Sequence, residues 1–270
     1  MVISLSTGSL YHLPLQEIFE IGREAGFEGM EVLIAEGFSK RHPLDEILRL
    51  SEEVLPVKSI HTPFLRFRHW RGRISSLKKA VKWAKELGAE VVTFHPPNWL
   101  NFEFRFWQWM RWVKDFQAEV GQGVAVAIEN MPLVGSEIRF CGYFWSKTER
   151  LLKFAREKNL YLTFDTTHMG TRKMDIIPEF LAFYETGRVK NIHFSDWSPF
   201  REHRYPGKGL LPLSRFLNLL GRIGYGGLLT VELTPKDLPK ERDQIVAALE
   251  ALTSYIKALP ETPLKAWRKG

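Results

Sequence analysis

Eight short apolar segments alternate with helix-like segments along this sequence, and that alternation leaves few folds open to the chain. Near-continuous apolar segments are typical of strands buried on both faces of a parallel sheet. Eight strand–helix units within 270 residues favour a closed (β/α)8 TIM barrel, a single α/β domain, over an open doubly wound sheet. We expect strands at Val2–Ser6, Gly29–Leu33, Val57–His61, Val91–His95, Val124–Asn130, Leu160–Asp165, Val189–Ser195 and Leu228–Glu232.

Helical patterns fill the stretches between these strands. Pro14 opens the first helix, and Gly26 ends it. The unit REAGFEGMEV returns late in the chain as GRIGYGGLLTVE, as a barrel of repeated strand–helix units would give. We place one domain over residues 1–259 and a loose basic tail over residues 260–270. Further helices are expected at Leu44–Glu53, Leu77–Leu87, Arg105–Glu119, Lys147–Glu157, Ile176–Thr186, Leu213–Ile223 and Glu241–Leu259.

Histidine or carboxylate side chains stand at or near the ends of seven expected strands. In a barrel, the carboxyl ends of the strands meet on one face, where active sites are built. Imidazoles and carboxylates are the ligands of Zn²⁺, Mn²⁺, Co²⁺ and Mg²⁺, so the pattern predicts a metal site on that face. The residues are Glu31, His61, His95, Glu129, Asp165, His193 and Glu232.

The stretch Val189–Gly209 shows the pattern at its densest. An apolar strand delivers His193 and then Asp196, and we expect a loop to follow that carries Arg201, His203 and Lys208. Taken alone, this stretch is explained by a solvated loop beside one core histidine. The recurrence of polar groups at other strand ends favours a functional site instead. Glu31 could join that site, although an ion pair with a neighbouring arginine is the simpler expectation.

The cysteine count, the apolar runs and the net charge indicate where the protein is expected in the cell and which partners it is expected to bind. A single cysteine, Cys141, excludes an internal disulfide and suits the reducing cytoplasm, where we expect the protein. No signal-peptide pattern is present, and no apolar run reaches the ~18 residues of a membrane span, so we expect no membrane partner. The net charge of +7 favours acidic partners. Neither a P-loop nor a dinucleotide fingerprint is found.

Several motifs resemble the xylose isomerase-like TIM-barrel superfamily, which holds sugar isomerases and epimerases together with endonucleases of the endonuclease IV type. The resemblance extends to about Leu259. The motifs are HTPFL at His61–Leu65, FHPPNW at Phe94–Trp99, IENMP at Ile128–Pro132, FDTTHMG at Phe164–Gly170, IHFSD at Ile192–Asp196, HRYPGKG at His203–Gly209 and YGGLLTVEL at Tyr225–Leu233.

The isomerase and epimerase branch implies one divalent metal, Mn²⁺, Co²⁺, Mg²⁺ or Zn²⁺. Its ligands would be Glu129, Asp165, His193 and Glu232. Such a metal chelates a ketose carbonyl and its neighbouring hydroxyl and stabilises the enediolate. Glu129 and Glu232 would then act as base and acid on a small sugar or sugar phosphate. The resemblance also implies pocket residues at His61, His95, His168, Arg201 and His203, with Arg201 and His168 near substrate oxygens.

The endonuclease branch implies two or three zinc ions and a DNA partner. The first zinc would lie at His61, His95 and Glu129, and the second would use the four ligands already named. A third would need His168, His203 and an aspartate two residues before His203. That position holds Arg201, and a cation there disfavours a third zinc. A barrel that binds a sugar without turnover is a further alternative.

Basic and aromatic residues add substrate candidates. Phe64–Arg73, which includes Arg66, interleaves arginines with aromatic rings. The pattern suits nucleic acid, a sugar phosphate, or a solvated loop packing its stems on rings. Trp99, Trp197 and Lys208 are further candidates to contact substrate. The aromatic segment Asn98–Trp112 offers a surface for a homodimer, by analogy with other barrels.

Overall fold

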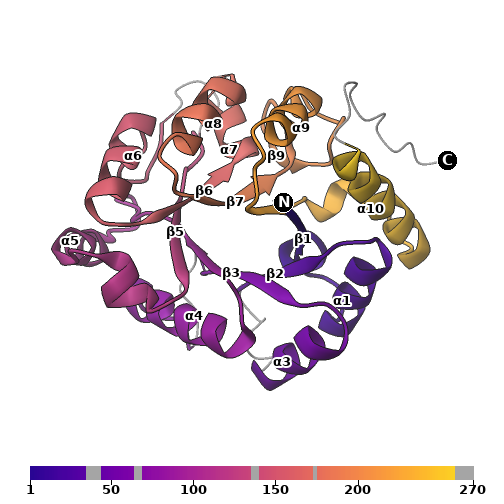
Figure 1. The fold of residues 1–270 in the computed structure, drawn as a ribbon, viewed down its shortest axis with the longest axis horizontal. Helices are drawn as coiled ribbons and strands as arrows, with labels where there is room; N and C mark the ends of the chain where they lie inside the picture. Colours follow the sequence, from indigo (N-terminus) through magenta and orange to yellow (C-terminus); the bar gives the residue numbers. More distant parts are fainter. Residues whose placement is uncertain (35–43, 64–68, 135–139, 173–174, 259–270) are drawn as a thin grey trace.

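Eight parallel strands form a closed barrel surrounded by helices (Figure 1). The structure, a computed structural model, describes residues 1–34, 44–63, 69–134, 140–172 and 175–258. Strand β1 pairs with β2 on one side and with β10 on the other, which closes the ring and confirms the predicted TIM barrel. The barrel strands are β1 (Val2–Ser6), β2 (Gly29–Leu33), β3 (Val57–His61), β4 (Val91–Phe94), β5 (Ala125–Glu129), β6 (Tyr161–Asp165), β7 (Val189–Phe194) and β10 (Leu228–Val231).

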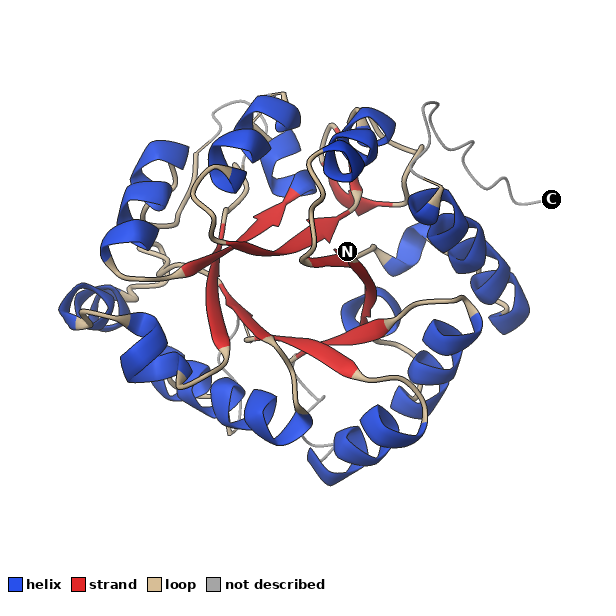
Figure 2. Ribbon diagram, in the orientation of Figure 1, coloured by secondary structure: helices blue, strands red, loops and turns tan. Residues whose placement is uncertain are grey.

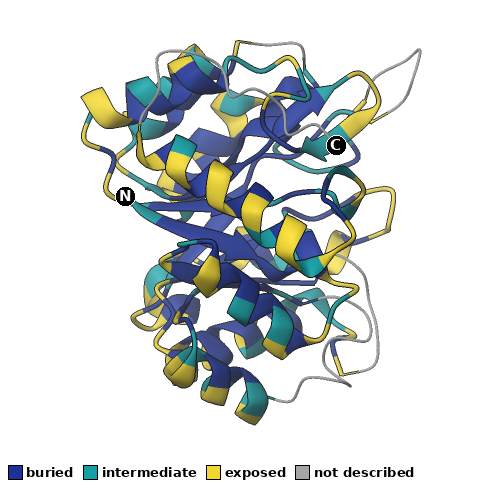
Figure 3. Ribbon diagram, turned by 90° about the vertical axis from the view of Figure 1, so that its right-hand side faces the viewer, coloured by how far each residue is buried: buried dark blue, intermediate teal, exposed yellow. Residues whose placement is uncertain are grey.

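Helices line the outside of the barrel, as Figure 2 shows. Their inner faces are buried against the strands, while their outer faces are exposed (Figure 3). Within the described residues, no helix is long and apolar enough to cross a membrane. The helices are α1 (Leu15–Glu24), α3 (Leu44–Glu53), α4 (Arg73–Leu87), α5 (Phe104–Trp112), α6 (Thr148–Glu157), α7 (Thr166–Gly170), α8 (Ile176–Tyr184), α9 (Leu213–Arg222) and α10 (Arg242–Lys257), with short helical turns η1 (Thr7–Leu10), η2 (Gln117–Gly121) and η3 (Pro235–Asp237).

The helix expected at Arg105–Glu119 is interrupted, which corrects that prediction. Helix α5 ends at Trp112 because Val113 adopts an extended conformation, and η2 follows as a separate turn. The ammonium of Lys158 donates to the carbonyl oxygens of Arg111 and Val113, so carbonyls left open at the helix end find a partner.

The segment after β7 also differs from the expected loop. Asp196–Ser198 (β8) and Arg201–Arg204 (β9) form an antiparallel hairpin that carries His203 over the barrel. The buried carboxylate of Asp196 accepts hydrogen bonds from the backbone N–H groups of Trp197, Leu211, Gly207 and Gly209. The bonds from Gly207, Gly209 and Leu211 fold the chain after the hairpin back onto it, and all three depend on the one side chain of Asp196.

Small polar side chains cross the middle of the barrel. Thr93 and Thr163 share a hydrogen bond of 2.9 Å, and the hydroxyl of Thr230 donates to Asn191 over the same distance. Bulky branched side chains are the usual filling of a barrel interior. The polar layer therefore places hydrogen-bonding groups directly beneath the carboxyl-end face.

Candidate metal centre

Four side chains predicted as ligands come together at the carboxyl ends of neighbouring strands. Glu129 and Asp165 are the last residues of β5 and β6, and His193 is the penultimate residue of β7. Asp165 stands opposite His193 in the strand register. Glu232 directly follows β10, which pairs with β7. The sheet register thus brings together residues that are far apart in sequence.

The Nδ1 atom of His193 faces three carboxylates. It lies 2.9 Å from Glu129 Oε1, 3.2 Å from Glu232 Oε2 and 3.7 Å from Asp165 Oδ2. Glu129, Asp165 and His193 are buried, whereas the Glu232 side chain is 17% exposed. Glu232 is therefore the member of this group most open to an entering molecule.

This donor set fits a divalent metal. Asp165 Oδ2 is buried and has no hydrogen-bond partner among the residues that the structure describes. A buried carboxylate oxygen without such a partner is costly. One ligand atom from each of Glu129, Asp165 and His193 lies within 4.8 Å of the others. A cation among these atoms would satisfy the open oxygen and offset the crowded negative charge.

The titration behaviour of these groups reflects the same crowding. Burial opposes protonation of His193, but the charges of Glu31 and Glu129 outweigh it and hold its pKa well above 6.5. Burial likewise opposes ionisation of Glu129, yet His193 and its other histidine neighbours keep the pKa of Glu129 well below 4.5. Burial raises the pKa of Asp165, against the pull of His168 and His203.

A second group of possible ligands shares Glu129. The Nε2 atoms of His61 and His95 lie 3.3 Å and 3.0 Å from Glu129 Oε2. Nδ1 of His61 donates to the carbonyl oxygen of Thr62. Burial opposes protonation of the His61 ring, but Glu129 and Glu31 outweigh it and raise the pKa of His61 above 6.5. Burial lowers the pKa of His95 to about 4, so its ring is neutral near pH 7. Neutral imidazoles are the form that binds metals.

A third group consists of Asp165, His168 and His203, whose ligand atoms lie within 4.8 Å of one another. His168 stands on α7, a short helix that sequence patterns did not predict. Asp165 caps α7 by accepting from the backbone N–H of His168 over 2.7 Å. Nδ1 of His168 donates to the carbonyl oxygen of Asn130, which turns Nε2 away from that carbonyl.

A cavity of about 200 Å³ opens beside these groups. Its polar lining comes from His61, His95, Glu129, His168, His203 and Glu232. Sequence patterns missed its other walls, Leu33, Met131, Pro132 and Tyr143. Tyr143, whose ring meets that of His95 edge-on, is placed by a bridge to Asn98, a contact between two loops that carries no short-range sequence signal.

Other predicted substrate residues lie away from that cavity lining. Arg201 is exposed on β9. His203 has a φ of 51°, which interrupts the alternation of side chains along β9, so Arg201 does not follow it into the cavity.

Lys208 donates to the carbonyl oxygen of Asp237. Trp197 is buried against α7, and Trp99, 42% exposed, donates to the carbonyl oxygen of Cys141. Arg66 and the tail at 260–270 lie outside the described residues.

Among the residues that the structure describes, Glu31 has no arginine partner, contrary to the expectation from sequence. Its carboxylate accepts from Ser59 and Asn191 and faces Nε2 of His193. The prediction was wrong because Glu31 points into the barrel, where strands β3 and β7 supply its neighbours. It therefore belongs to the surroundings of His193.

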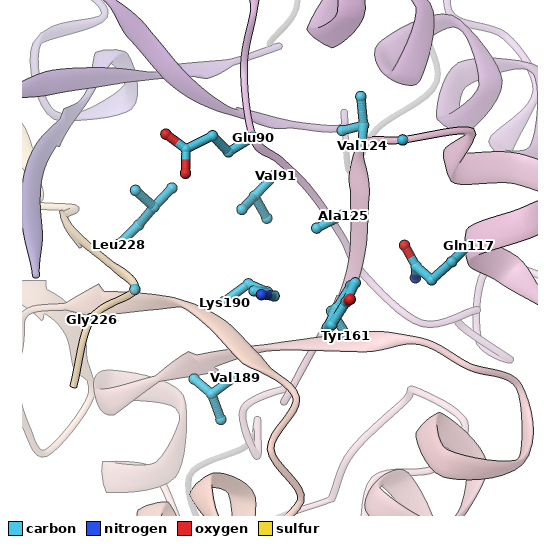
Figure 4. Close-up of a pocket in the computed structure, with 12 residues that line it drawn as sticks. Glu90, Val91, Gln117, Val124, Ala125, Tyr161, Val189, Lys190, Gly226 and Leu228 are labelled. Atoms are coloured by element: carbon cyan, nitrogen blue, oxygen red, sulfur yellow. The ribbon is translucent and has the colours of Figure 1, made fainter. Parts of the chain in front are cut away.

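A larger cavity, about 510 Å³, lies at the opposite mouth of the barrel (Figure 4). It is lined by residues at strand beginnings, such as Ala125, and its charged groups have partners. Glu90 pairs with Lys58, and the ammonium of Lys190 lies over the ring of Tyr161. None of the predicted site residues that the structure describes lines it. The predicted site residues that line either cavity therefore line the smaller one and not the larger one.

Comparisons with known proteins agree with this fold. An uncharacterized protein of Mycobacterium leprae is 28% identical over 278 residues, covering 93% of this chain and 95% of its own. A D-tagatose 3-epimerase-like protein superposes with a TM-score of 0.69 at 22% identity, covering 96% of this chain and 98% of its own. Endonuclease IV from Thermus thermophilus superposes with a TM-score of 0.65 at 17% identity, covering 96% and 100%. These two structural likenesses show the fold.

The match that defines the family covers most of the chain. The family model described as xylose isomerase-like TIM barrel matches residues 19–255, a range that contains every member of the three ligand groups. The closed barrel places those groups at one mouth. The chain therefore belongs to the xylose isomerase-like TIM barrel family.

Proposed function

We propose that this protein is a divalent-metal-dependent isomerase or epimerase of a small sugar or sugar phosphate. The observation that carries the proposal is the convergence of Glu129, Asp165 and Glu232 on Nδ1 of His193, beside a cavity of about 200 Å³. The cavity has room for the volume of about six or seven water molecules, which suits a small substrate. The solved relatives include a D-tagatose 3-epimerase-like protein and an L-ribulose 3-epimerase.

Glu129, Asp165, His193 and Glu232 would hold the metal. When bound, it supplies an electrophile that polarises a ketose carbonyl and the neighbouring hydroxyl. One carboxylate, Glu129 or Glu232, removes the proton from the carbon beside the carbonyl, and the electron pair of that C–H bond moves toward the carbonyl oxygen. Return of a proton to the opposite face of the same carbon inverts it. Return of the proton to the former carbonyl carbon gives the isomer, provided that the proton of the neighbouring hydroxyl moves to the former carbonyl oxygen.

The first test is the metal content of protein purified without chelator, by elemental analysis, followed by turnover on a panel of ketoses and their phosphates. We expect one divalent ion per chain and turnover that chelator removes and added metal restores. Glu232→Gln should keep the fold, measured by circular dichroism, and lose turnover. A fully active Glu232→Gln would contradict the proposal.

A second candidate function is zinc-dependent phosphodiester hydrolysis on abasic DNA. The two additional groups, His61–His95–Glu129 and Asp165–His168–His203, favour it because they could hold further ions. Arg201, two residues before His203, speaks against it. Two or three zinc ions per chain, with binding to abasic duplex DNA that weakens steeply with salt, would support this function instead. Binding of metal and sugar without turnover would support a sensor.

A further inference from the structure

The two nitrogens of the His193 ring approach different carboxylates. The Nε2 atom of His193 is 3.3 Å from both carboxylate oxygens of Glu31, while Nδ1 faces Glu129, Asp165 and Glu232. Glu31 is fully buried in the barrel, on β2. Within the described parts of the chain, its Oε1 atom has no hydrogen-bond partner. Burying a carboxylate costs free energy, so we expect the fully buried Glu31 to serve a purpose at this site.

The surrounding strands hold the carboxylate of Glu31 in place. Ser59 Oγ donates to Glu31 Oε2 over 2.8 Å, and Asn191 Nδ2 donates to the same atom over 3.0 Å. Thr230 Oγ1 donates to Asn191 Oδ1, which settles the orientation of the Asn191 amide and directs its N–H₂ at Glu31. Glu31 therefore accepts hydrogen bonds from strands on two sides of the barrel and is kept beneath His193.

We propose that Glu31 is a positioning residue for the metal centre: it accepts the Nε2–H of His193 and so presents the Nδ1 lone pair to the ion. An ionised carboxylate can only accept, so the ring nitrogen that faces it carries the hydrogen. In the neutral imidazole, the other nitrogen is then free to bind a metal. The inference rests on the proposed function only in placing a metal at His193, and it holds for any reaction that this metal serves.

The test compares metal binding by the full chain and by Glu31→Gln, which keeps the shape of the side chain and removes its charge. Zn²⁺ affinity is measured on metal-free protein by competition with a chromophoric chelator. We expect the affinity of Glu31→Gln to fall about 10- to 100-fold with an unchanged circular dichroism spectrum. The visible spectrum of the Co²⁺-loaded protein should shift, because the ligand field at His193 changes. Glu31→Asp, which keeps the carboxylate, should recover part of the affinity.

The matched control is Ser4→Ala. Ser4 is fully buried on the neighbouring strand β1, and its hydroxyl has no hydrogen-bond partner. Its loss should leave Zn²⁺ affinity and the Co²⁺ spectrum unchanged. If Glu31→Gln does not fold, Ser59→Ala replaces it: the loss of one donor to Glu31 should weaken Zn²⁺ binding and shift the Co²⁺ spectrum in the same direction.

Three outcomes separate this inference from the proposed function. A folded Glu31→Gln with native Zn²⁺ affinity and a native Co²⁺ spectrum would overturn the role of Glu31. Metal binding that depends on Glu31, without turnover of any sugar, would support the inference and contradict the proposed function. Failure of the unmodified protein to bind metal at all would overturn both.

Discussion

The guanidinium of Arg73 donates a hydrogen bond of 3.0 Å to the backbone carbonyl oxygen of His95. The same guanidinium donates to the carbonyl oxygen of Pro63 and lies 3.4 Å from the carboxylate of Glu103. Arg73 is the first residue of α4. It therefore ties together the two loops that follow β3 and β4, and with them the backbone that orients His95.

Replacing Arg73 with methionine should loosen the group formed by His61, His95 and Glu129. The two carbonyl oxygens and Glu103 would lose a buried charged donor, at a cost of about 1–3 kcal/mol in the free energy of unfolding. Urea unfolding measures this loss, and calorimetric titration with Zn²⁺ measures binding. Arg71→Met, an exposed change on the same loop, is the control. Equal stability of the two variants would show that Arg73 does not hold the loops.

If the His61–His95–Glu129 group holds a second metal, as in the zinc-dependent alternative, Glu129 and Glu232 should differ in how many metals depend on them. Glu129 contacts His61, His95 and His193, so Glu129→Gln should weaken binding at both groups that contain it, by at least about 100-fold. Glu232→Gln should spare the His61–His95–Glu129 group and lower turnover about 10²- to 10⁴-fold. Chelator competition gives both affinities. Identical metal losses in the two variants would rule out Glu129 as the shared ligand.

The stability of the metal-free protein should depend on pH on both sides of 6.5. Burial opposes the charge on His193, but Glu31 and Glu129 raise its pKa well above 6.5. The stabilisation that protonated His193 provides is fully present below the pKa of this histidine in the unfolded chain. It is lost as pH rises through the raised pKa of His193 in the folded protein. Burial lowers the pKa of His95 to about 4, so the unfolded chain gains a proton there first as pH falls below 6.5. We therefore expect the free energy of unfolding to decline in both directions.

Urea unfolding over this pH range, with EDTA and with excess Zn²⁺, measures the effect. Bound Zn²⁺ takes the place of the Nδ1 proton of His193, so it should flatten the alkaline decline. A metal-free protein whose stability stays constant from pH 6.5 upward would argue against a protonated His193.

Gly209 should not tolerate a side chain. A Cβ there would lie 2.2 Å from Asp196 Oδ1 and 2.4 Å from the carbonyl oxygen of Trp197. Gly209→Ala must displace the carboxylate that holds the segment after the hairpin, and we expect a loss of about 1–3 kcal/mol in unfolding free energy. Gly226→Ala is the control, because its Cβ meets no atom within 4 Å. Similar thermal midpoints for the two variants would contradict this account of Asp196.

Strand periodicity predicted the part of the centre that lies on the barrel. The bounds of β1, β2 and β3 agree with the predicted strands, and β5 and β6 differ only at their ends. Glu129 and Asp165 could be placed on one face because parallel strands in a closed barrel share their direction. For these residues, the local apolar pattern and the topology together determine the position.

Contacts between distant segments could not be predicted in the same way. Glu31 and His193 are 162 residues apart in sequence, and nothing near Glu31 indicates that its partner is a histidine. The hairpin β8–β9 depends on the bonds of Asp196, and the orientation of Arg201 depends on the backbone of His203. Such features arise from tertiary hydrogen bonds. The spacing of residues along the sequence does not predict these bonds.

Closure of the barrel between its first and last strands has a consequence for how the protein is made. Until β10 leaves the ribosome and pairs with β1, both β1 and β7 present open edges. His61, His95 and Glu129 emerge early, whereas Glu232 arrives only with that final strand. A nascent or prematurely terminated chain therefore lacks a complete set of ligands. Capture of a metal by the full set would therefore mark a chain in which β10 has been made and has closed the barrel.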